Sequence, residues 1–540
     1  MSLSEQLKKA HGAYYTREEV ADFLTAWAIR TPHDRVLDPS AGAGVFLKAA
    51  VQQLSRRGGS GASQVLGIEL LPETCKTTSR ELDGDGYAAR LFCRDFFETT
   101  SSDFGAVDAV VGNPPFIRYQ RFAGQMRKRA LERAEEAGVR ISALTSSWAP
   151  FLVHAVSFLR PGGRLAMVAP AELGHAAYAQ RVLQYLCDSF RTVIVLAFER
   201  RLFADLSEDT VLVLADDKGG RFESFTLHSL SGPEHLSADN GLGGGVRLDA
   251  RGVSSGAVRM IEYLLPARIR QLYQEIRTHR KVRNLGALAD VGIGYVTGAN
   301  DFFHLSFADA NLHGIPKRYL ARAVRRGSDF VGLMFSDRDW ESLAEKGAAN
   351  LLLRIRDTEK RLPASLQRYL ERGIAAGINQ RYKCRTREPW YAVPHVHEAD
   401  GFLTYMSGGV PRLVVNGARA VAPNTLHVIR MRPASLMSVG GLATAWQSSL
   451  TWLSCEIEGH SLGGGLLKLE PTEAERVLVP MLGEDRFDTE RLDRQLRDGS
   501  LTAVLDEVDS SVARTLGLAR ADLRKLCEGA KMLRERRSSR

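Results

Sequence analysis

The segment Asn113-Pro114-Pro115-Phe116 has the residue types and spacing to do chemistry on an amino group. It follows Val107 to Val111, an apolar run that predicts a buried strand. Two prolines can neither continue a strand ladder nor begin a regular helix, so they stiffen the loop and fix the direction of its carbonyls. The amide oxygen of Asn113 and the backbone carbonyl of Pro114 are two acceptors that suit the two donors of an NH₂ group. Phe116 adds a flat apolar face for stacking. For a bare Pro-Pro, without Asn113 before it and an aromatic after it, a rigid structural turn would be the better interpretation.

A second candidate lies at Asp38 to Phe46, where a short apolar run turns into helical sequence. Gly42 and Gly44 allow the backbone to approach a ligand closely, because no Cβ stands in the way. Open α/β sheets bind ligands at the carboxyl ends of their strands, which is where this loop falls. The loop differs from the dinucleotide fingerprint Gly-x-Gly-x-x-Gly, because Leu47 stands in the third glycine's place. A tight strand–helix turn is the alternative interpretation.

Two acids at the ends of the next strands favour a nucleoside site. Glu69 closes the run Val65 to Glu69, and one carboxylate there can accept both hydroxyls of a ribose. Asp95 follows the weaker strand candidate Leu91 to Cys93 and can accept a hydrogen bond from an adenine amino group, with Phe96 stacking on the ring. Either acid alone would be a solvated loop carboxylate. Their placement at successive strand ends indicates a shared site.

A sheet must position these residues. Strand-like and helix-like segments alternate up to residue 217, which predicts an α/β fold with a doubly wound, mostly parallel sheet. The apolar runs at 192–197 and 210–214 predict an antiparallel hairpin that closes one edge. Nine glycines between 219 and 256 indicate a loop-rich boundary at 218–260. From 261 to 540 the alternation is lost, with short extended runs at 380–396 and 411–429 and helical sequence at 473–533, so a second, α+β domain is expected.

Composition limits the class of protein. Of 540 residues, 25% are charged, which excludes global disorder. Lys and Arg number 72 against 63 Asp and Glu, and this surplus of 72 − 63 = 9 permits an acidic partner without requiring one. The six cysteines form no Cys-x-x-Cys pair, so neither a zinc ribbon nor a disulfide framework is expected. There is no apolar run of about 18 residues and no signal peptide, so we expect a cytoplasmic protein that does not contact membranes.

Taken in order, these motifs resemble the S-adenosylmethionine-dependent N6-adenine DNA methyltransferases of the gamma arrangement, the family of the TaqI methylase of restriction–modification systems. The resemblance covers residues 11–217. Its matching segments are Gly12-Ala13-Tyr14-Tyr15-Thr16 (motif X), Asp38 to Phe46 (motif I), Glu69 (motif II), Asp95-Phe96 (motif III), Asn113 to Phe116 (motif IV) and Arg201-Leu202-Phe203-Ala204 (motif VIII).

The resemblance implies a Rossmann-like class I methyltransferase sheet followed by a target-recognition domain. It also implies that S-adenosylmethionine is the cofactor, held by Tyr15, Thr16, Asp38, Pro39, Ala41, Gly42, Gly44, Phe46, Glu69, Asp95, Phe96 and Asn113. The catalytic residues would be Asn113, Pro114, Pro115 and Phe116, and Phe116 and Phe203 would stack on a flipped adenine. The family usually has Tyr where this chain has Phe116, a change that keeps stacking but removes a hydroxyl contact.

The second half contains a candidate for DNA contact. Residues 361–390 hold seven Lys and Arg against two acids, and the run Arg381, Lys383, Arg385 and Arg387 is interleaved with Tyr382. Such sequence suits phosphate contacts, although a solvated basic face is the alternative. Trp390 and Tyr391 fit core positions at least as well as DNA contacts. We expect double-stranded DNA as partner, a monomer or dimer associated with the nucleoid, and possible pairing with a separately encoded restriction endonuclease.

Two other functions remain open at this stage. Glutamine N5-methylases of proteins, or RNA N-methylases, share the Asn-Pro-Pro-aromatic chemistry, because a side-chain amide also presents an NH₂ group. They are much shorter, and a basic second half would have no use in them. A DNA-binding module with a degenerate methylase fold is disfavoured because every motif residue is present.

Overall fold

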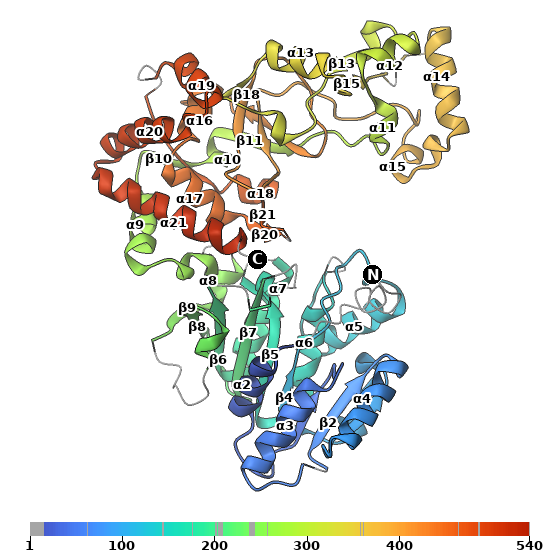
Figure 1. Cartoon of the computed structure of the whole chain (residues 1–540), viewed down its shortest axis with the longest axis vertical. Coiled ribbons are helices and arrows are strands. Elements are labelled where there is room, and N and C mark those ends of the chain that lie inside the picture. Colours follow the sequence, from blue (N-terminus) through green and yellow to red (C-terminus); the bar gives the residue numbers. More distant parts are fainter. Residues whose placement is uncertain are drawn as a thin grey trace. The chain divides into compact units, whose positions relative to one another are not determined.

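The structure is a computed structural model that describes residues 16–61, 63–142, 145–174, 177–199, 202–203, 209–236, 244–255, 258–356, 358–359, 361–462, 464–483 and 487–538. The chain forms two compact units, the first ending at Leu264 and the second spanning Leu265–Ser538 (Figure 1).

A nine-stranded sheet forms the centre of the first unit, in the order β3-β2-β1-β4-β5-β7-β6-β8-β9. The pairs from β3 to β5 are parallel, and β7 runs antiparallel to both β5 and β6. This confirms the predicted doubly wound, mostly parallel sheet. The strands are β1 Val36–Asp38, β2 Val65–Glu69, β3 Arg90–Cys93, β4 Val107–Gly112, β5 Leu159–Pro170, β6 Phe190–Phe198, β7 Thr210–Lys218, β8 Ser224–Leu230 and β9 Val246–Asp249.

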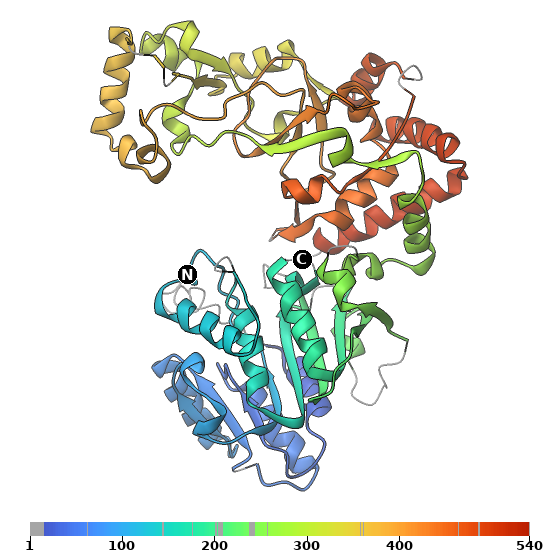
Figure 2. The same cartoon turned by 180° about the vertical axis from the view of Figure 1, so that it is seen from behind.

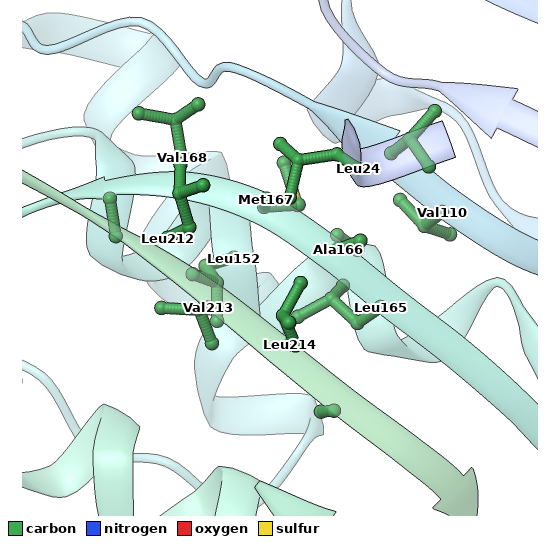
Figure 3. Packing of buried hydrophobic residues seen from close by; sticks show 14 of the residues in the cluster. Leu24, Val110, Leu152, Leu165, Ala166, Met167, Val168, Leu212, Val213 and Leu214 are labelled. Atoms are coloured by element: carbon green, nitrogen blue, oxygen red, sulfur yellow. The ribbon is translucent and has the colours of Figure 1, made fainter. Parts of the chain in front are cut away.

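Helices pack on this sheet and close its core. Figure 3 shows β5 and β7 side by side, with Leu165 to Val168 facing Leu212 to Leu214, and with Leu24 of α2 and Leu152 of α6 against them. α6 is apolar all round because it lies inside the unit, and nine of its ten residues are buried. The helices are α2 Glu18–Ala28, α3 Val45–Arg56, α4 Pro72–Gly84, α5 Gly124–Glu136, α6 Trp148–Ser157, α7 Ala177–Ser189 and α8 Ala250–Ser254.

The expected boundary at 218–260 is wrong where it contains β8 and β9. β8 pairs parallel with β6, and β9 pairs antiparallel with β8, so the hairpin of β6 and β7 does not close the edge of the sheet. The glycines suggested a loop, but Phe225, Leu227 and Leu248 are buried against the first unit's core. Alternation at a period of two residues outweighs glycine density here, because the inward side chains have a hydrophobic face to cover.

The second unit is α+β, as expected. Its five-stranded sheet has the order β11-β19-β16-β18-β14, and its other strands form smaller sheets β12-β15-β13, β17-β21-β20 and β10-β22. The strands are β10 Val282–Asn284, β11 Ala289–Ile293, β12 His304–Leu305, β13 Leu320–Arg322, β14 Met334–Phe335, β15 Leu351–Leu353, β16 Gly401–Thr404, β17 Met406–Ser407, β18 Leu413–Asn416, β19 Leu426–Met431, β20 His460–Leu462, β21 Leu466–Lys468 and β22 Leu478–Pro480.

Within this unit α14 and α15 lie at one end and α19 to α21 at the other, as both views show (Figures 1 and 2). The extended runs expected at 380–396 are not observed in that stretch, which begins in helical turns that include α15. The helices are α9 Ala267–Arg277, α10 Leu285–Leu288, α11 Asn300–Phe303, α12 Phe307–Leu312, α13 Asp337–Glu345, α14 Ala364–Ala375, α15 Tyr382–Arg385, α16 Val439–Ala445, α17 Ser449–Glu458, α18 Pro471–Ala474, α19 Thr489–Arg497, α20 Leu501–Leu516 and α21 Arg520–Ser538. Within the described ranges, no helix combines the length and apolarity needed to cross a membrane.

A buried ion pair fastens the end of α21 to the second unit. The Arg537 guanidinium donates to both carboxylate oxygens of Glu456, at 2.8 and 3.0 Å, and to the carbonyl of Gly409 at 2.8 Å. Both side chains are 3% exposed. Burial raises the pKa of Glu456 above its usual range, and Arg537 opposes that rise. Arg534 lies farther away, 3.9 Å from the same carboxylate, so Arg537 supplies most of the pairing that this buried charge requires.

Replacing Arg537 with Ala should therefore destabilise the second unit by about 3–5 kcal/mol, because Glu456 would keep a buried charge or take up a proton. Lys531→Ala is the matched control, since the exposed Lys531 ammonium lies 3.7 Å from Glu535 and should contribute at most about 1 kcal/mol. Urea unfolding of both variants measures the difference. Equal midpoints for the two variants would show that the Arg537 pair does not stabilise the fold.

Candidate active site

Three loops of the first unit meet at one edge of its sheet. β1 lies between β2 and β4 and is parallel to both. The carboxyl ends of these strands therefore point the same way, and Asp38, Glu69 and the segment after Gly112 fall at neighbouring strand ends. In open α/β sheets this edge is the place where ligands bind.

The loop after β1 is shaped by hydrogen bonds to β2 and α4. Gly42 and Gly44 have φ values of +50° and +78°, a left-handed conformation that favours glycine. The N–H of Ala41 donates to the carbonyl of Ile68 at 2.8 Å, and the Thr78 hydroxyl donates to the carbonyl of Gly42 at 2.7 Å. The glycine pattern in the sequence thus corresponds to a preformed turn.

Glu69 joins this loop to the end of β2. One carboxylate oxygen accepts the N–H of Gly42 and the other accepts the N–H of Leu71, both at 2.9 Å. Each carboxylate oxygen has a second lone pair, so the group can accept further donors from a ligand. Glu69 therefore has a structural role that the sequence did not predict. The ribose contact remains a prediction from the sequence.

Asp38 is a buried carboxylate with one unused oxygen. Its side chain is 1% exposed, and Oδ1 accepts the N–H of Ser40 at 3.0 Å, whereas Oδ2 has no partner among the described residues. Burial raises the pKa of Asp38 to about 7, and the charge of Glu69 adds to that rise. A Cβ on Gly112 would lie 2.9 Å from Asp38 Oδ1, so only glycine lets β4 end this close to the carboxylate.

Asn113 also keeps an acceptor in reserve. Its Nδ2 donates to the Thr16 hydroxyl at 3.2 Å, and its backbone carbonyl accepts from Ser40 Oγ at 3.0 Å. Its Oδ1 is buried and has no hydrogen-bond partner among the described residues. Because the Thr16 hydroxyl accepts the hydrogen bond from the amide nitrogen, the amide oxygen remains available to a donor from outside the protein. The contact brings together two predicted site residues; Tyr15 lies outside the described residues.

The predicted stacking residues and loop residues are mostly enclosed. Phe116, Phe203, Ala41 and Phe46 are all buried and belong to the first unit's hydrophobic core. Pro39 and Pro114 are buried as well, and Pro115 is half-buried.

Phe96, which is predicted to stack on the adenine ring of the cofactor, lies in the hydrophobic core. Its ring lies 4.5 Å from that of Phe151, 4.7 Å from His154 and 5.2 Å from Phe158, between centroids, so core rings surround it. Asp95 caps the turn that begins at Phe96, because its Oδ1 accepts the N–H of Phe97 at 2.9 Å. A pair of adjacent phenylalanines after a strand has a simpler use as core, which the sequence interpretation overlooked.

In the second unit the predicted basic run is divided between surface and interior. Arg381, Lys383 and Arg385 are exposed, and Tyr382 is 65% exposed. The Lys383 ammonium and the Arg385 guanidinium lie 5.5 and 5.7 Å from the Tyr382 ring centroid. These four residues form what we call the α15 patch.

Arg387 lies outside the α15 patch. It donates to the carbonyls of Val296 and Thr297, the latter at 2.9 Å, so its predicted DNA contact is corrected to a structural brace of that loop. Trp390 packs against Phe302 and Phe303, which supports the core interpretation for this aromatic.

Two serines were missed by sequence reasoning. Ser40 donates to the Asn113 carbonyl, and Ser147 donates to the Pro115 carbonyl and accepts the N–H of Ile117 at 2.9 Å. Ser40 lies inside a motif that was noticed for its glycines. Ser147 lies far from the loop in sequence, and no spacing rule would have found it.

Comparison with known families covers most of the chain. The family described as "N-6 DNA Methylase" matches residues 1–226, and the family described as "Type II methyltransferase M.Eco57I, C-terminal domain" matches residues 257–513. The first match contains every catalytic motif, in the unit that holds the site. The segment that holds the site, residues 1–226, therefore matches the N6-adenine DNA methylase family.

Similar proteins agree with this methyltransferase assignment, and a similar structure shows the same fold. The Type II methyltransferase M.AccI of Acinetobacter calcoaceticus is 21% identical over 89% of this chain and 87% of its own length. The Type II methyltransferase M.XamI of Xanthomonas campestris pv. amaranthicola is 24% identical over 87% and 85%. The Type IIL restriction-modification enzyme MmeI, solved in complex with DNA, has the same fold, with a TM-score of 0.57 and 12% identity over 99% of this chain and 80% of its own. The protein-glutamine and RNA alternatives gain no support from these matches.

The contribution of Asp38 to the stability of the ligand-free methyltransferase should fall as pH rises from about 4 to 7. Over that window the folded state holds the Asp38 proton more tightly than the unfolded chain, whose carboxyl titrates near its ordinary value of 3.8. Ionising Asp38 in the folded protein therefore costs stability. Asp38→Asn removes this cost and should stabilise the ligand-free protein by up to about 4 kcal/mol at pH 8. Denaturant unfolding at pH 4 and pH 8 measures it; an equal effect of the substitution at both pH values would contradict the account.

Proposed function

We propose that this methyltransferase transfers a methyl group from S-adenosylmethionine to the N6 amino group of an adenine flipped out of duplex DNA, as the modification enzyme of a restriction–modification system. The observation that supports this most strongly is the buried Oδ1 of Asn113, which has no hydrogen-bond partner among the described residues. It lies beside the glycine loop on a segment stiffened by two prolines. The proposal assigns the reaction to Asn113, Pro114, Pro115 and Phe116.

The loop from Asp38 to Gly44 and the carboxylate of Glu69 fit a nucleoside that also bears a cationic amine. Glu69 can accept two ribose hydroxyls through the lone pairs that Gly42 and Leu71 leave unused. The unused Oδ2 of Asp38 would gain a cationic donor, which would favour its ionised form. S-adenosylmethionine combines a ribose with an ammonium group, and it supplies an electrophilic sulfonium methyl group. Thr16 and Asn113 would border the methyl-bearing end.

The amino nitrogen of adenine is a poor nucleophile because the ring delocalises its lone pair. Asn113 Oδ1 and the Pro114 carbonyl would accept its two hydrogens, which favours a localised lone pair aimed at the methyl group. The nitrogen–carbon bond would form as the carbon–sulfur bond breaks, S-adenosylhomocysteine would leave, and the methylated nitrogen would lose one of its two hydrogens as a proton to solvent. Orientation and fixed dipoles then provide most of the rate, and no covalent enzyme intermediate is needed. An amino group inside a duplex cannot reach the loop, so the base must leave the stack. Stacking on Phe116 and Phe203 would offset part of that cost of a few kcal/mol.

The α15 patch is proposed to contact DNA phosphates. Three exposed cations, Arg381, Lys383 and Arg385, lie within five residues on one short helical segment, and two of them flank an exposed ring. Cations spaced in this way neutralise adjacent phosphates, and the ring can pack on a sugar or base. We further infer that the enzyme acts on cytoplasmic, nucleoid DNA as a monomer or dimer, beside a separately encoded restriction endonuclease.

Asn113→Ala should lower kcat by about 10²–10³-fold, because the acceptor that it removes acts on the amino group in the transition state. Cofactor affinity should stay close to that of the wild type, since Oδ1 is held for the base. Phe116→Ala should instead weaken capture of the flipped base by about 1–3 kcal/mol. Steady-state methyl transfer and calorimetry with S-adenosylhomocysteine separate the two effects. A large loss of S-adenosylhomocysteine affinity with unchanged kcat in Asn113→Ala would refute this role.

Removing the charges of the α15 patch should reduce the salt dependence of DNA binding. In the triple variant Arg381→Ala, Lys383→Ala, Arg385→Ala, up to three phosphate contacts are lost, and the slope of log K against log salt should fall by about 0.9 for each. The control replaces three exposed cations elsewhere in the second unit, Lys281, Arg338 and Lys346, with Ala. Filter binding across a salt series measures both. The same slope in both triple variants would remove the patch from the DNA interface.

A further inference from the structure

A buried serine holds the catalytic loop on both sides of Phe116. The Ser147 hydroxyl donates to the carbonyl of Pro115 and accepts the N–H of Ile117 at 2.9 Å. The main-chain N–H of Ser147 donates to the carbonyl of Ile117 at 3.0 Å. Ser147 is 1% exposed, so these bonds are shielded from bulk water. One residue thus makes three hydrogen bonds to a loop that cannot pair with a strand.

The position of Ser147 makes this use of its hydroxyl unusual. It stands directly before α6, where a serine side chain commonly accepts an N–H from the first turn of its own helix. No such cap bond is present, and the oxygen accepts from Ile117 instead. α6 itself is a firm base, because it is buried inside the first unit and packs against α5, α7 and β5. The hydroxyl therefore hydrogen-bonds to the catalytic loop and leaves the first turn of α6 without a side-chain cap.

Together the two side-chain bonds determine the backbone of Phe116. The Pro115 carbonyl belongs to the peptide plane before Phe116, and the Ile117 N–H belongs to the plane after it. Peptide planes are rigid, so holding both planes restrains φ and ψ of Phe116. These two angles set the direction of its Cα–Cβ bond, from which the ring extends. Pro115 adds to this rigidity on the other side, because its own φ is fixed by the pyrrolidine ring.

We propose that Ser147 is a positioning residue for methyl transfer, which directs the Phe116 ring and the Pro114 carbonyl toward the flipped base by clamping Pro115 and Ile117. The inference rests on the proposed function, because it requires a base to bind on this loop. Ser147 acts through the loop and makes no contact with the base or the methyl group.

The test compares Ser147→Ala with Thr145→Val in the full-length protein. Thr145 is a fully buried neighbour whose hydroxyl donates to the carbonyl of Ser146 at 3.0 Å, and valine keeps its shape. We expect Ser147→Ala to lower kcat on the order of 10- to 100-fold, because the loop loses its orientation. Thr145→Val should stay within about twofold of the wild type, and both variants should bind S-adenosylhomocysteine within about threefold of it. Tritium transfer to unmethylated duplex DNA, calorimetry and thermal melting give the three readouts.

Two further measurements keep the inference testable if Ser147→Ala folds poorly. Ser147→Thr retains the hydroxyl and should keep most of the wild-type kcat. With 2-aminopurine at the mapped target position, the Ser147→Ala complex should emit differently from the wild-type complex, because the Phe116 ring no longer covers the base in the same way. A Ser147→Ala kcat within about twofold of Thr145→Val, or a fall explained by the unfolded fraction alone, would overturn the inference. A wild-type protein that transfers no methyl group to DNA adenine would instead overturn the proposed function.

Discussion

At the end of β4 the backbone passes so close to the Asp38 carboxylate that no side chain fits at Gly112. The chain then continues through two prolines, which cannot donate to any neighbour. The loop that follows is therefore held by groups outside it: Ser40 at its first carbonyl, and Ser147 at its far end. The geometry of the candidate site depends on the path of the chain after β4, because Ser40, Ser147 and the loop after β1 all pack around the segment from Asn113 to Phe116.

The same region holds two buried acceptors that receive no hydrogen bond from the described residues, Asp38 Oδ2 and Asn113 Oδ1. A buried polar atom that makes no hydrogen bond costs about 1–3 kcal/mol, and a buried charge costs more. Other buried side-chain atoms of the described residues also lack a partner, but these two acceptors lie together at the carboxyl ends of adjacent strands. The cost is reasonable if a ligand provides the donors, since acceptors that are oriented beforehand need no reorganisation during the reaction. The unsatisfied acceptors lower the stability of the ligand-free protein, and a bound ligand that donates to them would restore it.

The parts that sequence predicted well are those in which local residue types dictate the outcome. Glycines with left-handed φ, an acid at a strand end and a Pro-Pro exit each specify local structure within a few residues. The sequence therefore predicted the turn at Asp38 to Gly44, the position of Glu69 at the end of β2 and that of Asn113 after β4. Contacts between distant segments were not predicted. Phe96 was expected to stack on the cofactor but packs against Phe151 of α6 and Phe158, which directly follows α6. Arg387 holds a loop about 90 residues earlier in the chain. The role of Ser147 could not be predicted from sequence patterns either, because its hydrogen bonds join segments that are distant in the chain. The strands β8 and β9 were missed because glycine content was given more weight than alternating burial.

The central claim, that the Asn113-Pro114 acceptors receive the amino group of adenine, is tested most directly by identifying the methylated base. Unmethylated duplex DNA would be incubated with the full-length protein and S-adenosylmethionine carrying a deuterated methyl group, then digested to nucleosides and examined by mass spectrometry. The account predicts label in N6-methyladenine. Label in N4-methylcytosine or 5-methylcytosine, or label confined to protein or RNA, would contradict it.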